Sequence, residues 1–248
     1  QTATAVPLQI VPTLRASDVE YLASNNTLAH VTLSGSGLVE GNNAEYHFGK
    51  VTVFDGSAST GPNVYGGAAP DYLVNGRVTL DVPISDDMQG GITVTTDGGT
   101  SAALTFGLTA VTGVAMSGTP AVPGQSSANP GQVVTLTGSK LATDTDVLFS
   151  FIASDGSNQR LVVNPMSVNA AGTSATIVVP AQANGIAKLQ ILGTAAAQTL
   201  QIVPTISSFN PTTSGTILVY GSGFVEGASS VQFVLATVKD ADTSSSGF

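Results

Sequence analysis

One hexapeptide, Leu-Gln-Ile-Val-Pro-Thr, occurs twice in this chain, at residues 8–13 and again at residues 200–205. A looser version, Leu-Thr-Phe-Gly-Leu-Thr, lies midway at residues 104–109, so that 96 residues separate each copy from the next. An apolar phrase that returns at a fixed interval indicates repeated structural units, and an interval of about a hundred residues is the length of a whole domain. The sequence therefore predicts tandem domains of one fold, with a copy of the hexapeptide at each junction.

The junctions predict how the 248 residues are divided. The last copy of the hexapeptide closes a domain, so the first copy predicts that the chain begins with the final strand, over Ala5–Val11, of a preceding repeat. About half a repeat follows the last copy, so we expect both ends to be cuts through a longer array. The predicted segments are a closing strand or linker at 1–13, a first domain at 14–107 with a long loop at 55–76, a second domain at 108–203, and the first half of a third, incomplete repeat at 204–248.

Each repeat also contains a strand that runs into a glycine turn. The first repeat has Gly35-Ser36-Gly37-Leu38 and the third has Gly221-Ser222-Gly223-Phe224. The middle repeat has Gly138-Ser139-Lys140-Leu141, in which Lys140 replaces the second glycine. The pattern predicts a strand, a tight turn or bulge that glycine permits, and one large apolar side chain that returns to the core.

The other predicted strands are short, rich in β-branched and aromatic residues, and separated by Gly, Pro and Asn. No stretch of about 11 residues carries the 3.6-residue apolar spacing of a helix. Short strands at about ten-residue spacing predict an all-β protein of tandem immunoglobulin-like β-sandwich domains, with about seven strands in each. The strands predicted to be equivalent are Lys50–Phe54 with Val147–Ile152 and Val231–Val234, Arg77–Pro83 with Ala175–Pro180, and Ile92–Thr96 with Ala187–Leu192.

Charge and composition exclude several classes of function. The net charge is −9, only 9% of the residues are charged, and the seven Lys and Arg residues are scattered singly. Because a nucleic-acid binder needs clustered cations, nucleic acid is excluded as a partner, and an anionic membrane surface is disfavoured for the same reason. The sequence contains no run of about 20 apolar residues, so membrane insertion is not predicted. The absence of cysteine excludes disulfides and thiolate metal sites.

The repeats share further elements that belong to a known pattern. The third repeat has Pro204-Thr205-Ile206, then Phe209-Asn210-Pro211, then Gly221–Phe224 and Val231-Gln232-Phe233, and the middle repeat keeps Asn129-Pro130-Gly131. These elements resemble the IPT/TIG family of immunoglobulin-like domains, most closely in the third repeat and least in the first. The resemblance implies a fold rather than a reaction. Such domains occur in surface receptors, in transcription factors and as strings in large bacterial surface proteins, and the lack of a basic face argues against the transcription factors.

The sequence predicts no catalytic, cofactor-binding or metal-binding residues. Cysteine is absent, and the bases of the usual kind are His30 and His47, which lie in predicted strands where a surface or packing role is favoured over catalysis. Glu40 and Glu226 occupy equivalent turns of separate repeats, so they cannot form the carboxylate pair of a glycosidase.

Three other chemistries remain as alternatives. Aspartates in turns supply the oxygen ligands that suit Ca²⁺, although none reproduces a Ca²⁺-binding loop and an ordinary turn role is favoured. Lys50 or Lys140 would be the lysine of an internal Lys–Asn isopeptide bond, and Tyr65 and Tyr72 in the long loop would stack on sugar rings. The aspartates concerned are Asp86, Asp87, Asp144, Asp146, Asp155, Asp240 and Asp242.

The favoured hypothesis is a non-enzymatic structural or adhesive segment of a repetitive extracellular bacterial surface protein, acting as a spacer or in adhesion to cells or substrates. Its expected partners are neighbouring repeats of the same polypeptide, other copies of itself, or a surface glycan or protein. One alternative is a carbohydrate-binding accessory module of an exported enzyme. Another is a self-assembling filament or surface-layer subunit, in which a strand from one copy completes the half-repeat of the next.

Overall fold

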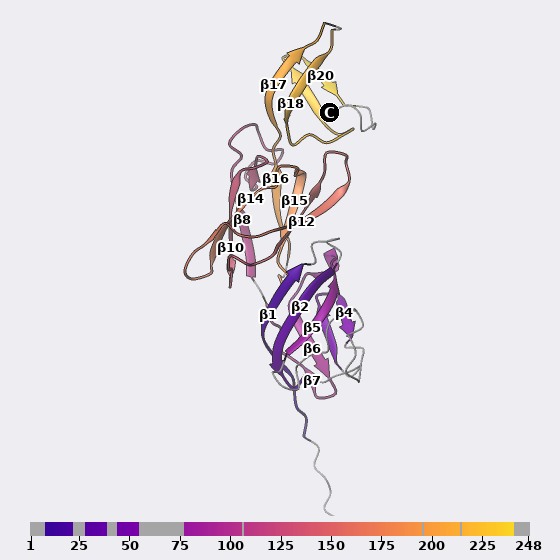
Figure 1. The fold of residues 1–248 in the computed structure, drawn as a ribbon, viewed down its shortest axis with the longest axis vertical. Coiled ribbons are helices and arrows are strands. Elements are labelled where there is room, and N and C mark those ends of the chain that lie inside the picture. Colours follow the sequence, from indigo (N-terminus) through magenta and orange to yellow (C-terminus); the bar gives the residue numbers. More distant parts are fainter. Residues whose placement is uncertain are drawn as a thin grey trace, which may run out of the picture. The chain divides into compact units, whose positions relative to one another are not determined.

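The computed structural model describes residues 8–21, 28–38, 44–54, 77–105, 107–194, 196–213 and 215–240. Figure 1 shows that the regular structure of these residues is almost wholly β-strand, and a single 3₁₀ turn spans Asp86–Met88 among them. The chain divides into two compact units: unit 1 comprises residues 1–107 and 192–196, and unit 2 comprises residues 108–191 and 197–248. The predicted fold class, an all-β protein of tandem β-sandwich domains, is confirmed.

Unit 1 contains one three-stranded and one four-stranded antiparallel sheet. The strand order is β1-β2-β5 in the first sheet and β4-β3-β6-β7 in the second. A tight turn at Gly49 and Lys50 joins β3 to β4. The strands are β1 (Thr13–Tyr21), β2 (Leu28–Ser36), β3 (Glu45–Phe48), β4 (Val51–Phe54), β5 (Arg77–Pro83), β6 (Ile92–Thr96) and β7 (Gly99–Thr100).

The core of unit 1 follows from the period-two alternation of its strands. Val31 and Leu33 of β2, Leu80 of β5, and Tyr46 and Phe48 of β3 are all fully buried. Because successive side chains of a strand point to opposite faces, buried residues at every second position define the inner face of each sheet. Burial of one such side chain stabilises a fold by about 1.5–3 kcal/mol, so these inner faces hold the two sheets together.

Unit 2 contains a complete sandwich of a four-stranded and a five-stranded sheet. The orders are β13-β14-β10-β8 and β12-β11-β15-β16-β9, and the β9–β16 pair is parallel. The strands are β8 (Gly107–Thr112), β9 (Ser127–Ala128), β10 (Val133–Ser139), β11 (Val147–Ile152), β12 (Asn158–Val163), β13 (Ser167–Val168), β14 (Ser174–Val178), β15 (Asn184–Gln190) and β16 (Gln198–Ile202).

Two buried amide side chains fasten the long connection between β8 and β9 to the end of β16. Asn129 Nδ2 donates to the carbonyl oxygens of Ser117 and Val203, both at 2.9 Å, and Asn129 Oδ1 accepts from the Ser117 backbone N–H. Gln201 Nε2 donates to the Val122 carbonyl oxygen and Gln201 Oε1 accepts from the Val122 N–H, both at 2.8 Å. Asn129 satisfies the carbonyl oxygen of the buried Val203, and the bonds to Ser117 and Val122 order a segment with little secondary structure.

The sandwich of unit 2 is followed by two separate β-hairpins, drawn in orange and yellow in Figure 1. One pairs β17 (Thr205–Pro211) with β18 (Ile217–Ser222), and the other pairs β19 (Ser230–Phe233) with β20 (Ala236–Lys239). In the part of the chain that the structure describes, each hairpin is a two-stranded sheet with no third strand. Such a hairpin is marginally stable by itself in water.

The Pro-Thr end of the hexapeptide forms the same motif with the Gly-Ser-Gly turn in both units. The Thr13 hydroxyl lies 2.6 Å from that of Ser36, and the Thr205 hydroxyl lies 2.8 Å from that of Ser222. In both pairs the strand register shifts one residue after the Thr partner, between Leu14 and Ala16 in β1 and between Ile206 and Ser208 in β17. The shift is a β-bulge at an equivalent position in the two repeats.

Glycine is favoured at the two positions of this motif for different physical reasons. A Cβ atom on Gly35 would lie 1.9 Å from the carbonyl oxygen of Thr13, so the close approach of the bulged strand requires glycine there. Gly37 has a φ of +71°, a left-handed conformation that residues with a Cβ adopt at a cost. In the middle repeat the residue at this second position is Lys140, and it also has a left-handed φ, of 57°. The bulge-and-turn prediction therefore holds, and the middle repeat keeps the conformation without the glycine.

Three details of the predicted strands are wrong. Residues 8–12 form no strand, and the first strand of unit 1 begins at Thr13; Ala5 to Pro7 of the predicted strand lie outside the described residues. Lys50–Phe54 is not the equivalent of Val147–Ile152, because β3 rather than β4 pairs with strands on both sides, as β11 does. The middle copy of the hexapeptide is not a closing strand: Leu104 makes one isolated bridge, and β8 belongs to a sheet of unit 2.

Candidate binding surface

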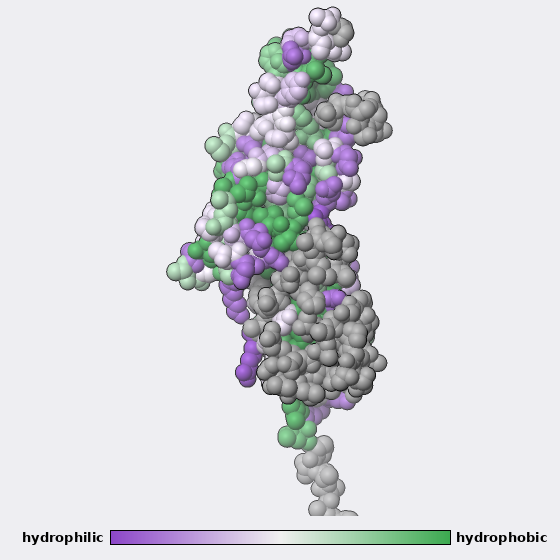
Figure 2. All heavy atoms as spheres, in the orientation of Figure 1, coloured by the Kyte–Doolittle hydropathy of each residue, from purple (hydrophilic) through white to green (hydrophobic). Residues whose placement is uncertain are grey.

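An open apolar groove of about 850 Å³ lies between the β17–β18 and β19–β20 hairpins of unit 2. Its lining includes Ile217 and Val219 of β18, Val231 and Phe233 of β19, and Val238 of β20. Figure 2 shows hydrophobic residues at the surface of these hairpins, next to paler and polar ones. Exposed apolar surface of this kind marks a place where a protein contacts another molecule.

The residues that line the groove hold positions that are buried in unit 1. Unit 1 pairs Tyr46 with Val53 and Phe48 with Val51, and the β19–β20 hairpin pairs Val231 with Val238 and Phe233 with Ala236 in the same pattern. Phe48 is fully buried and Val53 is 1% exposed, whereas Phe233 is 37% exposed and Val238 is 57% exposed. The groove is therefore the inner face of a sandwich whose core positions are only half covered.

The second wall of the groove repeats this relation. The Gly-Ser-Gly turns place Ile217 at the position of Val31, and Ile217 is 46% exposed whereas Val31 is fully buried. Complete burial of an apolar side chain of this size is worth about 1.5–3 kcal/mol, and Ile217, Phe233 and Val238 are each near half-exposed. Covering these three side chains would therefore yield roughly 3 kcal/mol.

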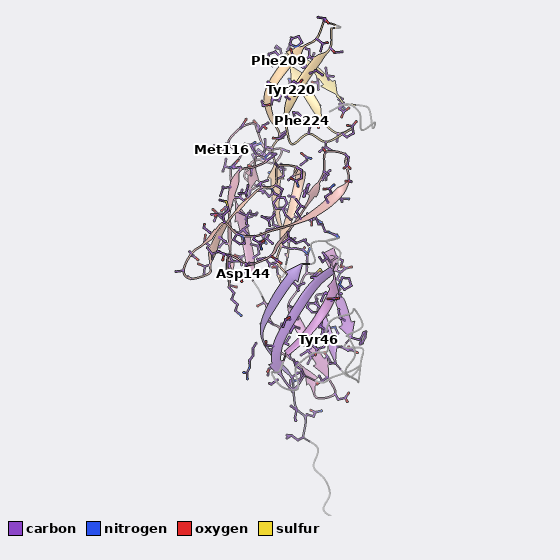
Figure 3. All side chains as sticks on the ribbon, viewed as in Figure 1. Tyr46, Met116, Asp144, Phe209, Tyr220 and Phe224 are labelled. Carbon is purple, nitrogen blue, oxygen red and sulfur yellow. The ribbon has the colours of Figure 1, made fainter. Side chains whose placement is uncertain are left out.

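The floor and rim of the groove differ in polarity. Figure 3 shows Phe209, Tyr220 and Phe224 on the hairpin region, and Phe209 is 68% exposed. Charge is confined to Glu226, Lys239 and Asp240 among the lining residues, and Asp240 Oδ2 accepts a hydrogen bond from the Gly227 N–H at 2.8 Å. An apolar floor with a sparse polar rim suits a polypeptide ligand better than a highly charged one.

The sandwich of unit 2 contributes nothing to the lining of this groove. One hydrogen bond, from the Glu226 N–H to the Ser154 carbonyl oxygen at 2.7 Å, connects the turn before β19 to the turn after β11. The residues that line the groove all lie between Gly215 and Asp240. The groove thus stays open although this hydrogen bond ties the hairpins to the sandwich.

Of the histidines and glutamates named from the sequence, the structure describes the side chains of His47 and Glu226. His47 lies on β3, where its Nδ1 is 3.1 Å from the Thr52 hydroxyl and its Nε2 is 3.6 Å from a carboxylate oxygen of Glu45. These are neighbours across one hairpin, which fits a surface role. His30 lies on β2, and its side chain lies outside the described residues, as does the whole of Glu40.

The predicted acidic turns serve as local hydrogen-bond acceptors. The Ser157 hydroxyl and backbone N–H donate to Asp155 Oδ1 at 2.6 and 2.9 Å, and these bonds lower the pKa of the Asp155 carboxyl below its usual value. Asp146 Oδ1 accepts from Asn164 Nδ2 at 2.6 Å. Among the residues that the structure describes, no three His, Cys, Asp or Glu side chains are grouped as a metal site would require, and Asp242 lies outside them.

The remaining candidates have equally local roles. Lys50 Nζ lies 3.5 Å from Asp87 Oδ1, and the Lys50 side chain is 84% exposed, so it is not the buried lysine that an isopeptide bond requires. Lys140 is exposed as well. Tyr65 and Tyr72 lie outside the described residues. No helix among the described residues has the length and apolar character needed to cross a membrane.

The sequence analysis does not predict this groove. The signal that could have found it is the third copy of the pattern, in which Ile217, Val219, Val231 and Phe233 stand at core positions of the other repeats. These residues were expected in strands, but strand pattern alone does not tell whether the opposing half of a core is present.

Comparisons with known proteins leave the family open. No family model matches the sequence, and no curated protein matches it. The chain is similar in structure to SGBP-B from a complex xyloglucan utilization locus in Bacteroides uniformis, at 13% identity and a TM-score of 0.27, covering 81% of this chain and 55% of that one. It is also similar to a tetra-tandem repeat in the extending region of a large adhesion protein, at 14% identity and a TM-score of 0.19, covering 95% of this chain and 66% of that one. This chain thus spans less than two thirds of either protein, and likeness at these TM-scores carries no argument about function.

Proposed function

We propose that this chain is a non-enzymatic structural segment of an extracellular surface protein, in which tandem β-sandwiches act as a mechanical spacer. The observation that carries the proposal is the way unit 2 is closed. The last strand, β16, pairs in parallel with β9 near the start of the same sandwich. A pull that reaches β9 from its N-terminal side and β16 from its C-terminal side would load these parallel strands in shear, so the bonds between them would break together.

The hydrogen bonds that close the sandwich of unit 2 lie close together. The Gln201 N–H donates to the Ser126 carbonyl oxygen at 2.9 Å, and the Val203 N–H donates to the Ala128 carbonyl oxygen at 2.8 Å. The Gln201 side chain adds its two bonds to Val122. Each such bond contributes about 0.5–1.5 kcal/mol net. Bonds that must break together resist a pulling force better than bonds that break one after another, so these bonds support a role under force.

The connection that leaves unit 2's sandwich supports the same role. Only Val203 and Pro204 separate the end of β16 from the start of β17. Val203 is buried and bonded to Asn129, and the proline ring fixes the φ of Pro204. A two-residue link held at both positions limits bending, which a spacer needs. The low charge, the absence of cysteine and the resemblance to strings of surface domains support an extracellular location.

Single-molecule force spectroscopy on the whole chain, tethered at both ends, tests the proposal. We expect a discrete unfolding event for the sandwich of unit 2, residues 108–203, that releases roughly 300 Å of chain. Gln201→Ala should lower the unfolding force of this event, since it removes two of the closing bonds. Gln159→Ala on β12 is the matched control, because that exposed side chain lies on the opposite edge of the same sheet. An unfolding force that is the same in Gln201→Ala as in the wild-type chain contradicts the mechanical role.

A further inference from the structure

The two C-terminal hairpins reproduce the first four strands of unit 1. The β17–β18 pair has the Thr–Ser register and the bulge of the β1–β2 pair, and the β19–β20 pair has the register of the β3–β4 pair. The equivalence is therefore one of strand pairing, and it assigns β18 to the place of β2 and β19 to the place of β3.

Both complete sandwiches show what lies on the other edges of these strands. In unit 1, β2 also pairs with β5, and β3 also pairs with β6. In unit 2, β10 pairs with β14, and β11 pairs with β15. All four pairs are antiparallel. The corresponding edges of β18 and β19 carry no strand in the part of the chain that the structure describes, so their outward backbone groups are available for pairing.

The strands that cover these edges in the complete sandwiches share a sequence pattern. Ala175 and Ile177 on β14 are at most 1% exposed, and Ala187 and Leu189 on β15 are fully buried. Pro180 and a turn at Ala181 and Gln182 separate the two strands. The covering element is thus a strand with alternating apolar residues, a short connection, and a second such strand on the facing sheet.

We propose that the groove between the hairpins is a strand-acceptor site, and that its ligand is a two-stranded polypeptide segment with the pattern of residues 174–190. One strand of the ligand pairs antiparallel with β18 and the other with β19, and their alternating apolar side chains fill the groove. The partner is the second half of an immunoglobulin-like repeat. This mode of recognition is strand addition, in which backbone hydrogen bonds supply affinity and the alternating pockets supply specificity.

A synthetic peptide of residues 172–190, added to the whole chain, tests this site. Hydrogen exchange read out by NMR should show at least tenfold protection, at saturating peptide, of those β18 and β19 amides that point away from β17 and β20. The matched control is the same peptide with Ile177→Ser and Leu189→Ser, which keeps length and turn but removes an apolar side chain from each strand. We expect its binding to be at least tenfold weaker.

Four results would overturn the proposal. The first is the absence of protection in β18 and β19 at saturating wild-type peptide. The second is equal binding of the control peptide, which would remove the role of the apolar pockets. The third is protection of the same amides in the chain alone that rises with its concentration, because a second copy of this chain would then be the occupant. Protection of β10 and β11 instead would show that the peptide exchanges into the sandwich of unit 2, and would equally contradict the site.

Discussion

Lys140 offers the most direct test of how the repeated turn is built. It follows β10 at the position that Gly37 holds after β2 and that Gly223 holds after β18, and its φ of 57° is left-handed like theirs. A residue with a Cβ atom pays a steric penalty in this conformation, and glycine does not. We therefore predict that Lys140→Gly stabilises unit 2.

The magnitude follows from two opposing effects. The left-handed conformation costs a residue with a Cβ about 1–2 kcal/mol, which the substitution would recover. Glycine also makes the unfolded chain more flexible, and this effect takes back about 0.4–1 kcal/mol. The net gain in the free energy of unfolding should be about 0.5–1 kcal/mol, which raises the Tm of a domain of this size by roughly 2–8 °C.

Differential scanning calorimetry of the whole chain measures the effect on the transition of unit 2. Lys140→Ala is the matched control, since it removes the same lysine contacts and charge but keeps the Cβ atom. We expect Lys140→Gly to melt at a higher temperature than Lys140→Ala. If the two variants melt together, or if the glycine variant melts lower, backbone conformation does not explain the glycine at this position of the repeat.

Four further substitutions test other parts of the structure. Asn129→Ala should destabilise unit 2 by about 2–4 kcal/mol in chemical denaturation, because it removes three hydrogen bonds and leaves the carbonyl of the buried Val203 unpaired. Val234→Gly should stabilise the β19–β20 hairpin by about 1 kcal/mol, measured as slower amide exchange, since a β-branched residue with a φ of 52° is strained; unchanged exchange would refute this strain. Leu200→Ala should cost unit 2 about 2–5 kcal/mol, whereas Leu8→Ala should change the stability of unit 1 by less than about 0.5 kcal/mol, since Leu200 is fully buried and Leu8 is 85% exposed.

The sequence sufficed for the fold class and for the glycine motif. Period-two strands, short spacing and the absence of helical periodicity determine an all-β chain because each follows from local backbone geometry. Gly35 and Gly37 could be assigned to a bulge and turn because few other residues fit such positions. Pro83, the last residue of β5, illustrates the same logic, since a proline cannot donate to a ladder and so marks a strand end.

Strand equivalence and the binding surface depended on pairing that is not local. The β-branched residues Val51 and Val53 favour the prediction that Lys50–Phe54 is equivalent to Val147–Ile152, whereas Glu45 and His47 make β3 partly polar. Only the register shows that β3 lies between β4 and β6 and buries Tyr46. The groove was missed for the same reason: an apolar residue in a strand pattern is expected to be buried, and exposure becomes visible only when the strands around it are placed.

The two halves of the hexapeptide at 200–205 serve two different structural elements. Leu200 and Ile202 lie in β16 and are buried in the sandwich that this strand closes, whereas Thr205 begins β17 and bonds to the turn of the following hairpin. A substitution in the first half of the phrase therefore acts on the preceding domain, and one in the second half acts on the next. In the first copy only the Pro-Thr half makes its contact, since Thr13 bonds to Ser36 while Leu8 is exposed. These two constraints meet across Val203 and Pro204, so we expect an insertion between these residues to separate β16 from β17 and to leave each constraint intact on its own side.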